Sequence, residues 1–559
     1  MFCSNIFFFF FFMFFFFILF SLFFYEYGLI FFFELVFFSF NSFNFSLVFL
    51  FDWISLIFMS FVFLISGSVL MYSLGYMGGD KNLIRFFFLV FFFIISMIFF
   101  IMMPDLICLL LGWDGLGLIS YCLVIYYSNK SSLYSGLITL FINRLGDVFL
   151  ILSIGWFFNF GSWHYFFYMD FFSFDFFFVV YLILFASFTK SAQFPFSFWL
   201  PAAMAAPTPV SSLVHSSTLV TSGVYLIIRF NIYLFYFDTF YLMIISLLTM
   251  FFSGVSACLE TDLKKIIAFS TLSQLGFMFF VVSFGSLVLC FLHLLVHAVF
   301  KSLLFLCSGF FIHCFFGNQD IRFMGGLLIQ CPYISSCFFI SLMCLCGLPF
   351  FSGFYSSDFV FELIILSEVG FFFFFFFCLV VGLTIFYSLR IIYYLFFCNF
   401  FFFSYMSFFY NFYMNLSLFI LFFFSIFGGS FIFWMFGDFI FVIDDFLKFV
   451  PLLVFFFFFF FSFDFFSEVF IFYNFFIYFF FSSMIFLNYF SSSFFLRRFF
   501  SFSSFYYSLF DVGWLEFMIS GNLGFFFNYF SNFLNSFFFK IFYFYFFFFF
   551  FFFFFFFFF

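Results

Sequence analysis

The stretch that decides the fold covers residues 188 to 215 and reads FTKSAQFPFSFWLPAAMAAPTPVSSLVH. An apolar helix predicted over residues 176 to 189 leads into it. Lys190 then stands where a membrane-spanning helix ordinarily carries no charge, and a lysine near the bilayer centre costs about 2.5–3.5 kcal/mol on insertion scales. Pro195 and Pro201 follow, and proline interrupts a helix because it lacks the amide donor and clashes with the preceding turn. The stretch therefore predicts a helix that is broken beside a charge.

A broken helix beside a charge has two interpretations. Backbone groups freed at membrane depth are tolerated only where they are buried in protein or line a water-filled cavity. With Lys190 beside them, they indicate a site for ion movement. The alternative is a lysine whose side chain reaches from a helix end to the interface, next to an ordinary loop. The stretch alone leaves both interpretations open.

The composition assigns the whole chain to the membrane. Of its 559 residues, 69% are hydrophobic and only 7% are charged, and the mean hydropathy is +1.36. No soluble fold uses such a composition, whereas a polytopic helical membrane protein does. At about 20 apolar residues for each span, the length predicts an all-α polytopic membrane protein with about 14–16 transmembrane helices.

Other features of the composition exclude several kinds of function. The formal charge of −8 is spread over short loops without a basic run, so no nucleic-acid partner is expected. The thirteen cysteines are scattered, and Cys344 and Cys346 are too close in sequence for a zinc site. We expect buried, inert thiols and no bound metal. The 159 phenylalanines make every face of many helices look alike, so span boundaries are predicted only coarsely.

A second interruption, GLPFFSGFYSSD, lies at residues 347 to 358. Two apolar segments broken by Gly and Pro in corresponding positions are typical of an inverted-repeat transporter fold. Elsewhere we expect an extramembrane loop at residues 26 to 44, a serine-rich segment lying along the membrane at 482 to 520, and a last span beginning near residue 537. The other expected helices cover residues 7–24, 52–72, 86–102, 106–127, 133–158, 207–229, 240–258, 287–313, 371–397, 417–436 and 451–463, with one more starting at the charged junction 260–265.

Asp114, Arg144 and Asp147 are charged residues that stand inside predicted helices. Asp114 lies in the glycine-rich run LGWDGLG, where another helix can approach closely and where neighbouring backbone groups could simply donate hydrogen bonds to the carboxylate. Arg144 and Asp147 are three residues apart on one helix face. They either neutralise each other or tune a functional group, and their spacing alone does not decide between these roles.

His293, His297 and Lys301 form a stripe along one predicted helix, because spacings of four residues share a helix face. Zinc is a poor explanation, since the stripe lacks the glutamate of the HExxH motif and is followed by a cation. A lone histidine is usually a satisfied core residue. Two histidines in line with a lysine instead indicate a proton wire, because imidazole titrates near neutrality.

The residues also resemble a known family, chain five of mitochondrial NADH–ubiquinone oxidoreductase. The likeness is detailed and in order over about residues 52 to 362, and beyond them only DVGWLE at 511 to 516 resembles the family. The runs that carry it are LGWDGLGLISYCLVIYY (111–127), NRLGD (143–147), KSAQ (190–193), PTPVSSLVHSSTLVT (207–221), STLSQLG (270–276), HAVFK (297–301), NQDIRFMGG (318–326) and GLPFFSGFY (347–355).

This resemblance implies the distal antiporter-like membrane subunit of respiratory complex I, in the mitochondrial inner membrane. It implies two inverted five-helix repeats, each with a broken helix, and a long lateral helix before the last span. We expect N-terminal helices and a loop at 1–105, antiporter-like halves at 106–258 and 259–400, and C-terminal helices with the membrane-parallel segment at 401–559. The expected partners are the other membrane-arm subunits and lipid. No cofactor is expected on this chain, because NADH, FMN, iron–sulfur clusters and ubiquinone belong to partner subunits.

The resemblance also implies roles for the charged residues. Asp114 stands where an acid pairs with Lys190, although many relatives carry the longer glutamate, so the aspartate must reach further. Arg144 and Asp147 would tune that pair. A proton path would then continue through His215 to the stripe formed by His293, His297 and Lys301, with Lys301 as the central lysine.

One position departs from the family pattern. Relatives usually carry Ser-Lys-Asp after the Gly-Phe-Tyr of the second broken helix, whereas this chain has serine at Ser357. Serine holds no proton charge near neutral pH, so the usual exit group is missing. Asp358 or Glu362 could replace it, and these two share a helix face. The alternatives are an exit through water alone or an alignment displaced by one residue.

Two rival functions remain at this point. A multisubunit cation/proton antiporter shares these motifs, although the run at 511 to 516 and the organelle-like composition favour complex I. A structural scaffold, in which the charges merely pair, would keep pumping intact after Lys190→Ala. The function predicted from the sequence is a proton-translocating membrane-arm subunit that couples NADH-to-quinone electron transfer to proton pumping.

Overall fold

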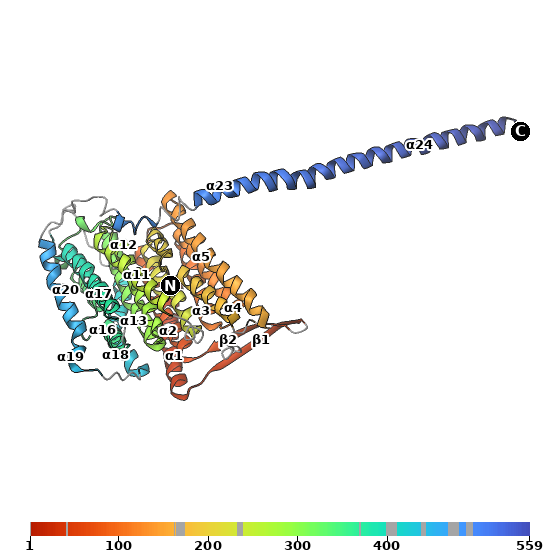
Figure 1. Cartoon of the computed structure of the whole chain (residues 1–559). Helices are drawn as coiled ribbons and strands as arrows, with labels where there is room; N and C mark the ends of the chain where they lie inside the picture. Colours follow the sequence, from red (N-terminus) through yellow and green to blue (C-terminus); the bar gives the residue numbers. More distant parts are fainter. Residues whose placement is uncertain are drawn as a thin grey trace. The chain divides into compact units, whose positions relative to one another are not determined.

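The computed structural model describes residues 2–40, 43–160, 163, 174–231, 239–367, 370–398, 411–437, 443–467, 480–487 and 496–558. The chain forms two compact units, Met1–Leu487 and Asn488–Phe559. In the part described, twelve helices are long and apolar enough to cross a membrane (Figure 1). The all-α polytopic fold is thereby confirmed. Three shorter apolar helices bring the total to the expected number, and two of them are single arms of interrupted helices.

The first unit begins with an apolar helix, and a β-hairpin separates this helix from the next one. Its first elements are α1 (Phe2–Tyr27), β1 (Phe31–Phe40), β2 (Phe43–Phe51), α2 (Trp53–Tyr76), α3 (Leu83–Met102), α4 (Leu106–Val124), α5 (Lys130–Phe157) and η1 (Phe158–Phe160). The interrupted region follows as α6 (Phe174–Lys190), η3 (Phe196–Phe198), α7 (Trp199–Ala203), α8 (Thr208–Val210), η4 (Ser211–Thr218) and α9 (Leu219–Arg229).

The remainder of the first unit repeats the pattern of long helices with one interruption. Its elements are α11 (Phe240–Leu259), α12 (Leu263–Ser283), α13 (Leu287–Cys314), η5 (Ile321–Phe323), α14 (Leu327–Gln330), α15 (Pro332–Cys346), α16 (Ser352–Leu366), α17 (Phe371–Ile392), η6 (Tyr393–Phe397), α18 (Phe412–Phe436), α19 (Asp445–Lys448) and α20 (Val450–Ser467).

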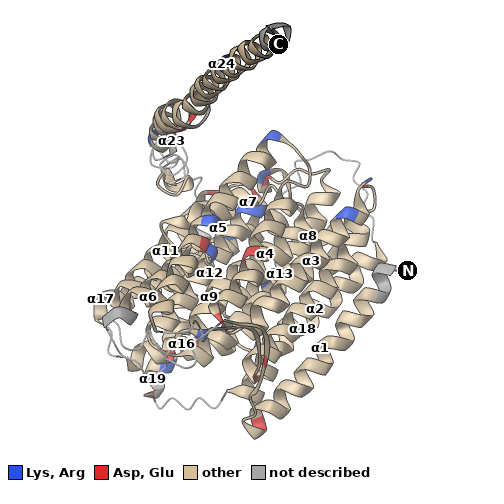
Figure 2. Ribbon diagram, turned by 90° about the vertical axis from the view of Figure 1, so that its right-hand side faces the viewer, with Lys and Arg blue, Asp and Glu red and all other residues tan. Residues whose placement is uncertain are grey.

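The centre of this unit is α13. It packs against α2, η4, α12, α15, α16 and α18, and nearly all of its side chains are buried. By contrast, α1 and α5 present many large apolar side chains on the outside, as suits contact with lipid. Charged residues are sparse throughout the bundle (Figure 2), so each buried one needs an explanation.

The loop expected at residues 26 to 44 is wrong, because most of this segment belongs to the antiparallel hairpin of β1 and β2. Phenylalanine, valine and leucine fill both strands, and aromatic and β-branched residues favour extended backbone. Because phenylalanine is so frequent, the segment lacks the regular alternation of apolar and polar residues by which a strand is ordinarily predicted. Directly after the hairpin, Asp52 caps α2: its carboxylate accepts the Ser55 amide at 2.9 Å while the Ser55 hydroxyl accepts the Asp52 amide at 3.0 Å.

Both predicted interruptions are present. The helix α6 ends at Lys190, and a turn through Ala192 (φ +55°) leads to η3 and α7. The helix α15 ends at Cys346, Gly347 adopts φ +70°, and α16 begins five residues later. A Cβ at Gly353 would lie within the van der Waals radius of the Cys344 carbonyl oxygen, so only glycine lets α16 start so close to the end of α15.

The second unit is helical over all of its described residues. It consists of α23 (Leu496–Tyr506), η8 (Tyr507–Leu515), η9 (Phe517–Gly521) and α24 (Asn522–Phe558). No helix boundary occurs near residue 537, because α24 runs from Asn522 to Phe558, and the start of a last span at that point stays a prediction. The expectation that residues 482 to 520 lie along the membrane stays a prediction.

Candidate functional site

Lys190 lies fully buried at the C-terminal end of α6. Its ammonium donates a hydrogen bond to the Trp113 carbonyl oxygen at 3.0 Å and lies 4.6 Å from the centre of the Trp113 ring. The path of the side chain passes α4 at Gly117, where a Cβ would lie 3.6 Å from Nζ. A cation held by a carbonyl dipole and an aromatic face is stabilised without a full counter-charge.

Trp113 also connects Lys190 to the charges of α5. The indole Nε1–H donates to Oδ1 of Asp147 at 2.8 Å. Arg144 donates to Oδ2 of the same carboxylate at 2.9 Å and lies 3.7 Å from Oδ1 of Asp114. Arg144 therefore stands between two carboxylates. The predicted close approach at Asp114 is present, because a Cβ at Gly112 would lie 2.6 Å from the Phe100 amide nitrogen of α3.

Asp114 and Lys190 do not form a direct ion pair in this conformation. Within the described residues, no carboxylate oxygen lies within 4.0 Å of the Lys190 ammonium. Oδ1 of Asp114 is buried without a hydrogen-bond partner in that same part of the chain, although the side chain as a whole is 38% exposed. The charged group that lies near Asp114 is Arg144, and the pairing of Asp114 with Lys190 stays a prediction.

His215 lies in η4, the helical segment that follows the first interruption. Its ring is buried, packs edge-on at 6.2 Å from the Trp199 ring, and has no hydrogen-bond partner for either nitrogen among the described residues. The hydroxyls of the neighbouring serines donate hydrogen bonds to backbone carbonyls of the same helical segment; the Ser211 hydroxyl, for example, donates to the Thr208 carbonyl at 2.8 Å. Neither the imidazole nitrogens nor these serine hydroxyls are therefore joined in a described side-chain hydrogen bond.

The predicted stripe on α13 is buried along its whole length. Lys301 is completely buried, and its ammonium donates to the Ser270 hydroxyl of α12 at 2.6 Å. The rings of His293 and His297 lie 6.5 Å apart, and both nitrogens of His297 are without a hydrogen-bond partner in the described chain. The stripe therefore combines one held cation with a histidine that no neighbouring side chain fixes.

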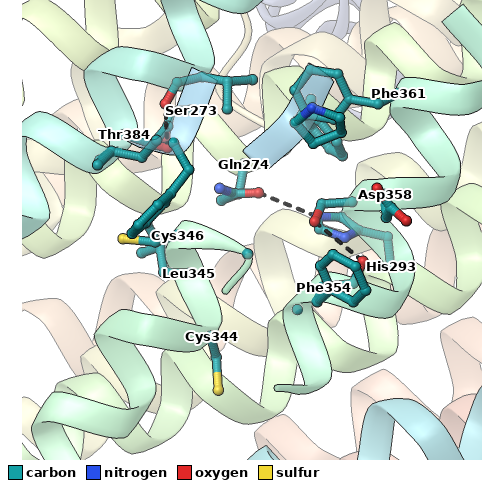
Figure 3. Close-up of a pocket in the computed structure, with 18 of the residues that line it drawn as sticks. Ser273, Gln274, His293, Cys344, Leu345, Cys346, Phe354, Asp358, Phe361 and Thr384 are labelled. Carbon is teal, nitrogen blue, oxygen red and sulfur yellow. Dashed lines mark hydrogen bonds between the residues drawn. The ribbon is translucent and has the colours of Figure 1, made fainter. Parts of the chain in front are cut away.

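His293 joins this stripe to a cavity at the second interruption. Its Nδ1 lies 2.8 Å from the Ser356 hydroxyl of α16, and its Nε2 lies 3.2 Å from Oε1 of Gln274. Figure 3 shows Gln274 and His293 linked across the cavity, with Asp358 beside them. The cavity is also lined by Ser273, Cys346, Thr384 and several apolar side chains.

The tentative exit residues differ in position. Asp358 and Ser357 both line the cavity, whereas Glu362, one turn further along α16, does not. The Ser357 hydroxyl donates to the Phe354 carbonyl at 3.3 Å and takes no part in a charge network in the described residues. The carboxylate of Asp358 therefore lies beside Ser357, the position at which the family resemblance implies a lysine.

Several partners in this site were missed from the sequence. Trp113, Ser270, Gln274 and Ser356 hold the predicted charged groups, and all four fall within the motifs quoted above or directly after them. A further cation, Lys264, is buried and donates to the Ala206 carbonyl at 3.1 Å, just before Pro207. The sequence placed Lys264 only in the charged junction from which a helix starts. In the described residues no group of three or more His, Cys, Asp or Glu side chains could hold a metal ion.

Comparison with protein families gives three consecutive matches. Residues 37–87 match "NADH-Ubiquinone oxidoreductase (complex I), chain 5 N-terminus". Residues 103–384 match "NADH:quinone oxidoreductase/Mrp antiporter, TM", and residues 387–559 match "NADH dehydrogenase subunit 5 C-terminus".

Individual relatives agree with these families. The chain is 45% identical over 488 residues to NADH-ubiquinone oxidoreductase chain 5 of Locusta migratoria, with 85% of each chain covered. It is 50% identical over 381 residues to the protein of the same name from Aedes aegypti, covering 67% of this chain and 65% of the relative. Among solved structures, the Mrp complex from Dietzia sp. DQ12-45-1b matches with a TM-score of 0.66 and 21% identity, covering 78% of this chain and 51% of that chain.

Proposed function

We propose a path for the protons that this chain translocates, since the chain belongs to the NADH-ubiquinone oxidoreductase chain 5 family. The protons pass along the buried polar side chains between Lys190 and the cavity at Asp358. The chain is a proton-translocating membrane subunit of NADH:ubiquinone oxidoreductase and a multi-pass protein of the mitochondrial inner membrane. Its partners are other subunits of complex I. The resemblance to the Mrp complex is one of fold alone at 21% identity, so it gives no separate support to an antiporter function.

The redox chemistry belongs elsewhere in this proposal. We assign NADH, FMN, the iron–sulfur clusters and ubiquinone to partner subunits, and lipid to the outer apolar helices. The energy then reaches this chain as a conformational or electrostatic signal. The interrupted helices of the two proposed halves, 106–258 and 259–400, are where such a signal can act, because their backbone is not locked into one continuous helix.

The first half responds through Arg144. When a carboxylate approaches a desolvated lysine, it stabilises the protonated, charged form of the lysine. When the carboxylate withdraws, the lysine releases its proton more readily. Arg144 lies between Asp114 and Asp147, and Trp113 joins Asp147 to Lys190. A shift of Arg144 from one carboxylate to the other would therefore change the field at Lys190 without moving the lysine itself.

The proton then passes from His215, in the first half, to the stripe on α13 in the second half. His215 and His297 each have both ring nitrogens free of protein hydrogen bonds in the described chain. A buried polar group without a partner is costly unless water satisfies it. We therefore assign water to these rings and a relay from His215 through Lys301 and His297 to His293, since imidazole can accept a proton at one nitrogen and donate from the other.

The proton leaves through the cavity beside α16. The observation that carries the proposal is His293, which contacts Ser356 and Gln274 and lines the same cavity as Asp358. Asp358 then acts in place of the lysine that Ser357 replaces. Unchanged pumping in Asp358→Asn would instead support an exit through water alone.

The test of this function is Lys301→Ala in the assembled complex, compared with Lys301→Arg. Loss of proton translocation and of coupled NADH–quinone turnover with Lys301→Ala, in a complex of normal subunit content, supports the path. Normal pumping after both Lys301→Ala and Lys190→Ala would mean that these charges serve only to hold the helices together.

A further inference from the structure

A third buried lysine, Lys264, lies in the first turn of α12. The residue is only 5% exposed, and its ammonium donates a hydrogen bond to the Ala206 carbonyl oxygen at 3.1 Å. Within the described residues, no carboxylate oxygen lies within 4.0 Å of this ammonium. A charge taken out of water destabilises the fold unless its contacts compensate for the lost solvation. The contact with Ala206 is therefore the feature of Lys264 that needs an explanation.

The neighbouring Lys265 shows what a lysine at this junction does otherwise. Its ammonium lies 2.6 Å from Oδ2 of Asp262, and its side chain is 43% exposed. Two adjacent lysines thus take different partners: one pairs with a carboxylate near the surface, and Lys264 reaches into the bundle to a backbone carbonyl. Because an exposed pair contributes little to stability, Lys265 is a matched control for Lys264.

The carbonyl that Lys264 contacts is one that the first interruption releases. In a continuous helix, the Ala206 carbonyl would accept a hydrogen bond from the amide of residue 210. Here the Val210 amide donates instead to the Pro207 carbonyl at 3.0 Å. A buried carbonyl needs a donor, and Lys264 supplies one. Lys264 thereby fixes the point from which the helical segment carrying His215 begins.

The first interruption is bounded by a buried lysine at each end. Lys190 ends the helix before the interruption and donates to the Trp113 carbonyl of α4. Lys264 donates to Ala206, the last residue before Pro207. Hydrogen bonds from a charged donor are stronger than those between neutral groups. A shift of the interrupted segment therefore acts on a charged hydrogen bond at either end.

Lys264 also connects the two proposed halves of the chain. Ala206 belongs to the first half, whereas α12 belongs to the second half and packs against α7, α9, η4 and α13. Ser270 lies six residues beyond Lys264 on α12, about 9 Å along the helix, and its hydroxyl accepts the Lys301 ammonium at 2.6 Å. One helix thus contacts the first interruption at one point and the central lysine of the second half at another.

We propose that Lys264 is a positioning residue that couples the first interruption to Lys301 through α12. This inference rests on the proposed function and adds the link between its two halves. When the interrupted segment shifts, the hydrogen bond between Ala206 and Lys264 transmits the shift to α12. The Ser270 hydroxyl moves with that helix and changes its contact with Lys301. No proton leaves Lys264 in this step, and only hydrogen bonds are altered.

The primary experiment compares Lys264→Met with Lys264→Arg and Lys265→Met in the assembled complex. Methionine keeps an unbranched side chain but cannot donate a hydrogen bond, whereas arginine keeps both the charge and the donors. We expect Lys264→Met to lower proton translocation and coupled turnover about tenfold, Lys264→Arg to retain most of both, and Lys265→Met to leave both unchanged. Normal pumping in Lys264→Met, or an equal loss in Lys264→Arg, would overturn the proposal.

A double variant separates coupling from a general defect of the fold. If Lys264 acts through Ser270, Lys264→Met should cause no further loss of turnover in a complex that already carries Ser270→Ala. Two independent structural defects would instead add, and additive losses would contradict the coupling. If Lys264→Met does not assemble, the same cycle is measured with Lys264→Gln, which keeps a shorter, neutral donor, and normal turnover of that variant would count against the link.

The outcome at Lys301 keeps this inference separate from the proposed function. If Lys264→Met pumps normally while Lys301→Ala abolishes pumping, the proposed function stands and only the link is wrong. Normal pumping in both variants would exclude the proposed path itself.

Discussion

The surroundings of the two central lysines differ in kind. Lys190 is linked through Trp113 to a cluster of ionised side chains, in which Arg144 and Asp114 are 40% and 38% exposed. Lys301 is held by one serine hydroxyl, and among the described residues no carboxylate forms an ion pair with it. Each lysine is thus held directly by a neutral group, but only Lys190 is connected through that group to charged side chains.

This difference suggests a division of roles between the two regions. Charges that are partly exposed can be moved by a neighbouring subunit, and the field they exert changes with their separation. Neutral partners exert little long-range field, but hydroxyls, amides and water can carry a proton onward. The Lys190 region is therefore suited to receive a signal, and the Lys301 region is suited to relay protons.

The largest expected effect is at Lys301. Lys301→Ala should lower proton translocation by about a hundredfold or more, because it removes a group that holds the proton in a fully buried path. His313→Ala, at the exposed end of the same helix, should have a much smaller effect, since bulk water can replace its ring. The measurement is pH-dye quenching in reconstituted vesicles. Equal effects of the two changes would contradict a wire along α13.

Asp114→Asn should lower NADH–quinone turnover and pumping together, by about tenfold, because the field that recharges Lys190 loses a carboxylate. The complex should still assemble, since Asp147 keeps its bonds to Trp113 and Arg144. Wild-type turnover in the Asp114→Asn complex would show that Asp114 does not control the protonation of Lys190, and would leave Asp147 as the carboxylate with that role.

The exit is expected to be less sensitive. Asp358→Asn should lower turnover roughly threefold, because water in the cavity can replace part of its role. Glu362→Gln is the matched control one turn away and should have less effect, because Glu362 does not line the cavity. Proton-to-electron stoichiometry is measured alongside activity. If neither variant alters either quantity, the carboxylate substitute for Ser357 is wrong.

The smallest effect on pumping is expected at a charge pair outside both regions. Arg229 at the end of α9 donates to Asp52 Oδ1 at 2.9 Å, and both side chains are largely buried. Asp52→Asn keeps a capping side chain on α2 but removes the charge, so it should destabilise the fold by about 2 kcal/mol. We expect a lower melting temperature of the detergent-solubilised complex and almost unchanged pumping at permissive temperature. Asp320→Asn, in the exposed pair with Arg322, is the control with a smaller shift.

The Asp52 pair also predicts a dependence on pH. Burial alone would raise the pKa of Asp52, but the Arg229 guanidinium and the hydrogen bonds from Ser55 outweigh it and lower the pKa below its ordinary value. The stabilisation is therefore complete above about pH 4, the pKa of an aspartate in an unfolded chain, and is lost as the pH falls through the lower folded value. Asp52→Asn should show no such acid-dependent loss.

The sequence by itself determined the features that depend on a single segment. The apolar composition requires membrane helices, the prolines and glycines around Lys190 and Gly347 interrupt two of them, and spacings of four residues put His293, His297 and Lys301 on one face. The hairpin of β1 and β2 escaped prediction because phenylalanine occupies both of its faces and removes the alternation on which strand prediction depends.

Only the tertiary structure decided which polar groups meet. The Trp113 carbonyl, rather than the Asp114 carboxylate, receives the Lys190 ammonium; Ser270 receives Lys301; and the Ala206 carbonyl receives Lys264. These contacts join helices that are far apart in the chain. Each is set by how closely two helices pack and how each is rotated about its axis, and a helix whose faces are all apolar carries no sequence record of that rotation.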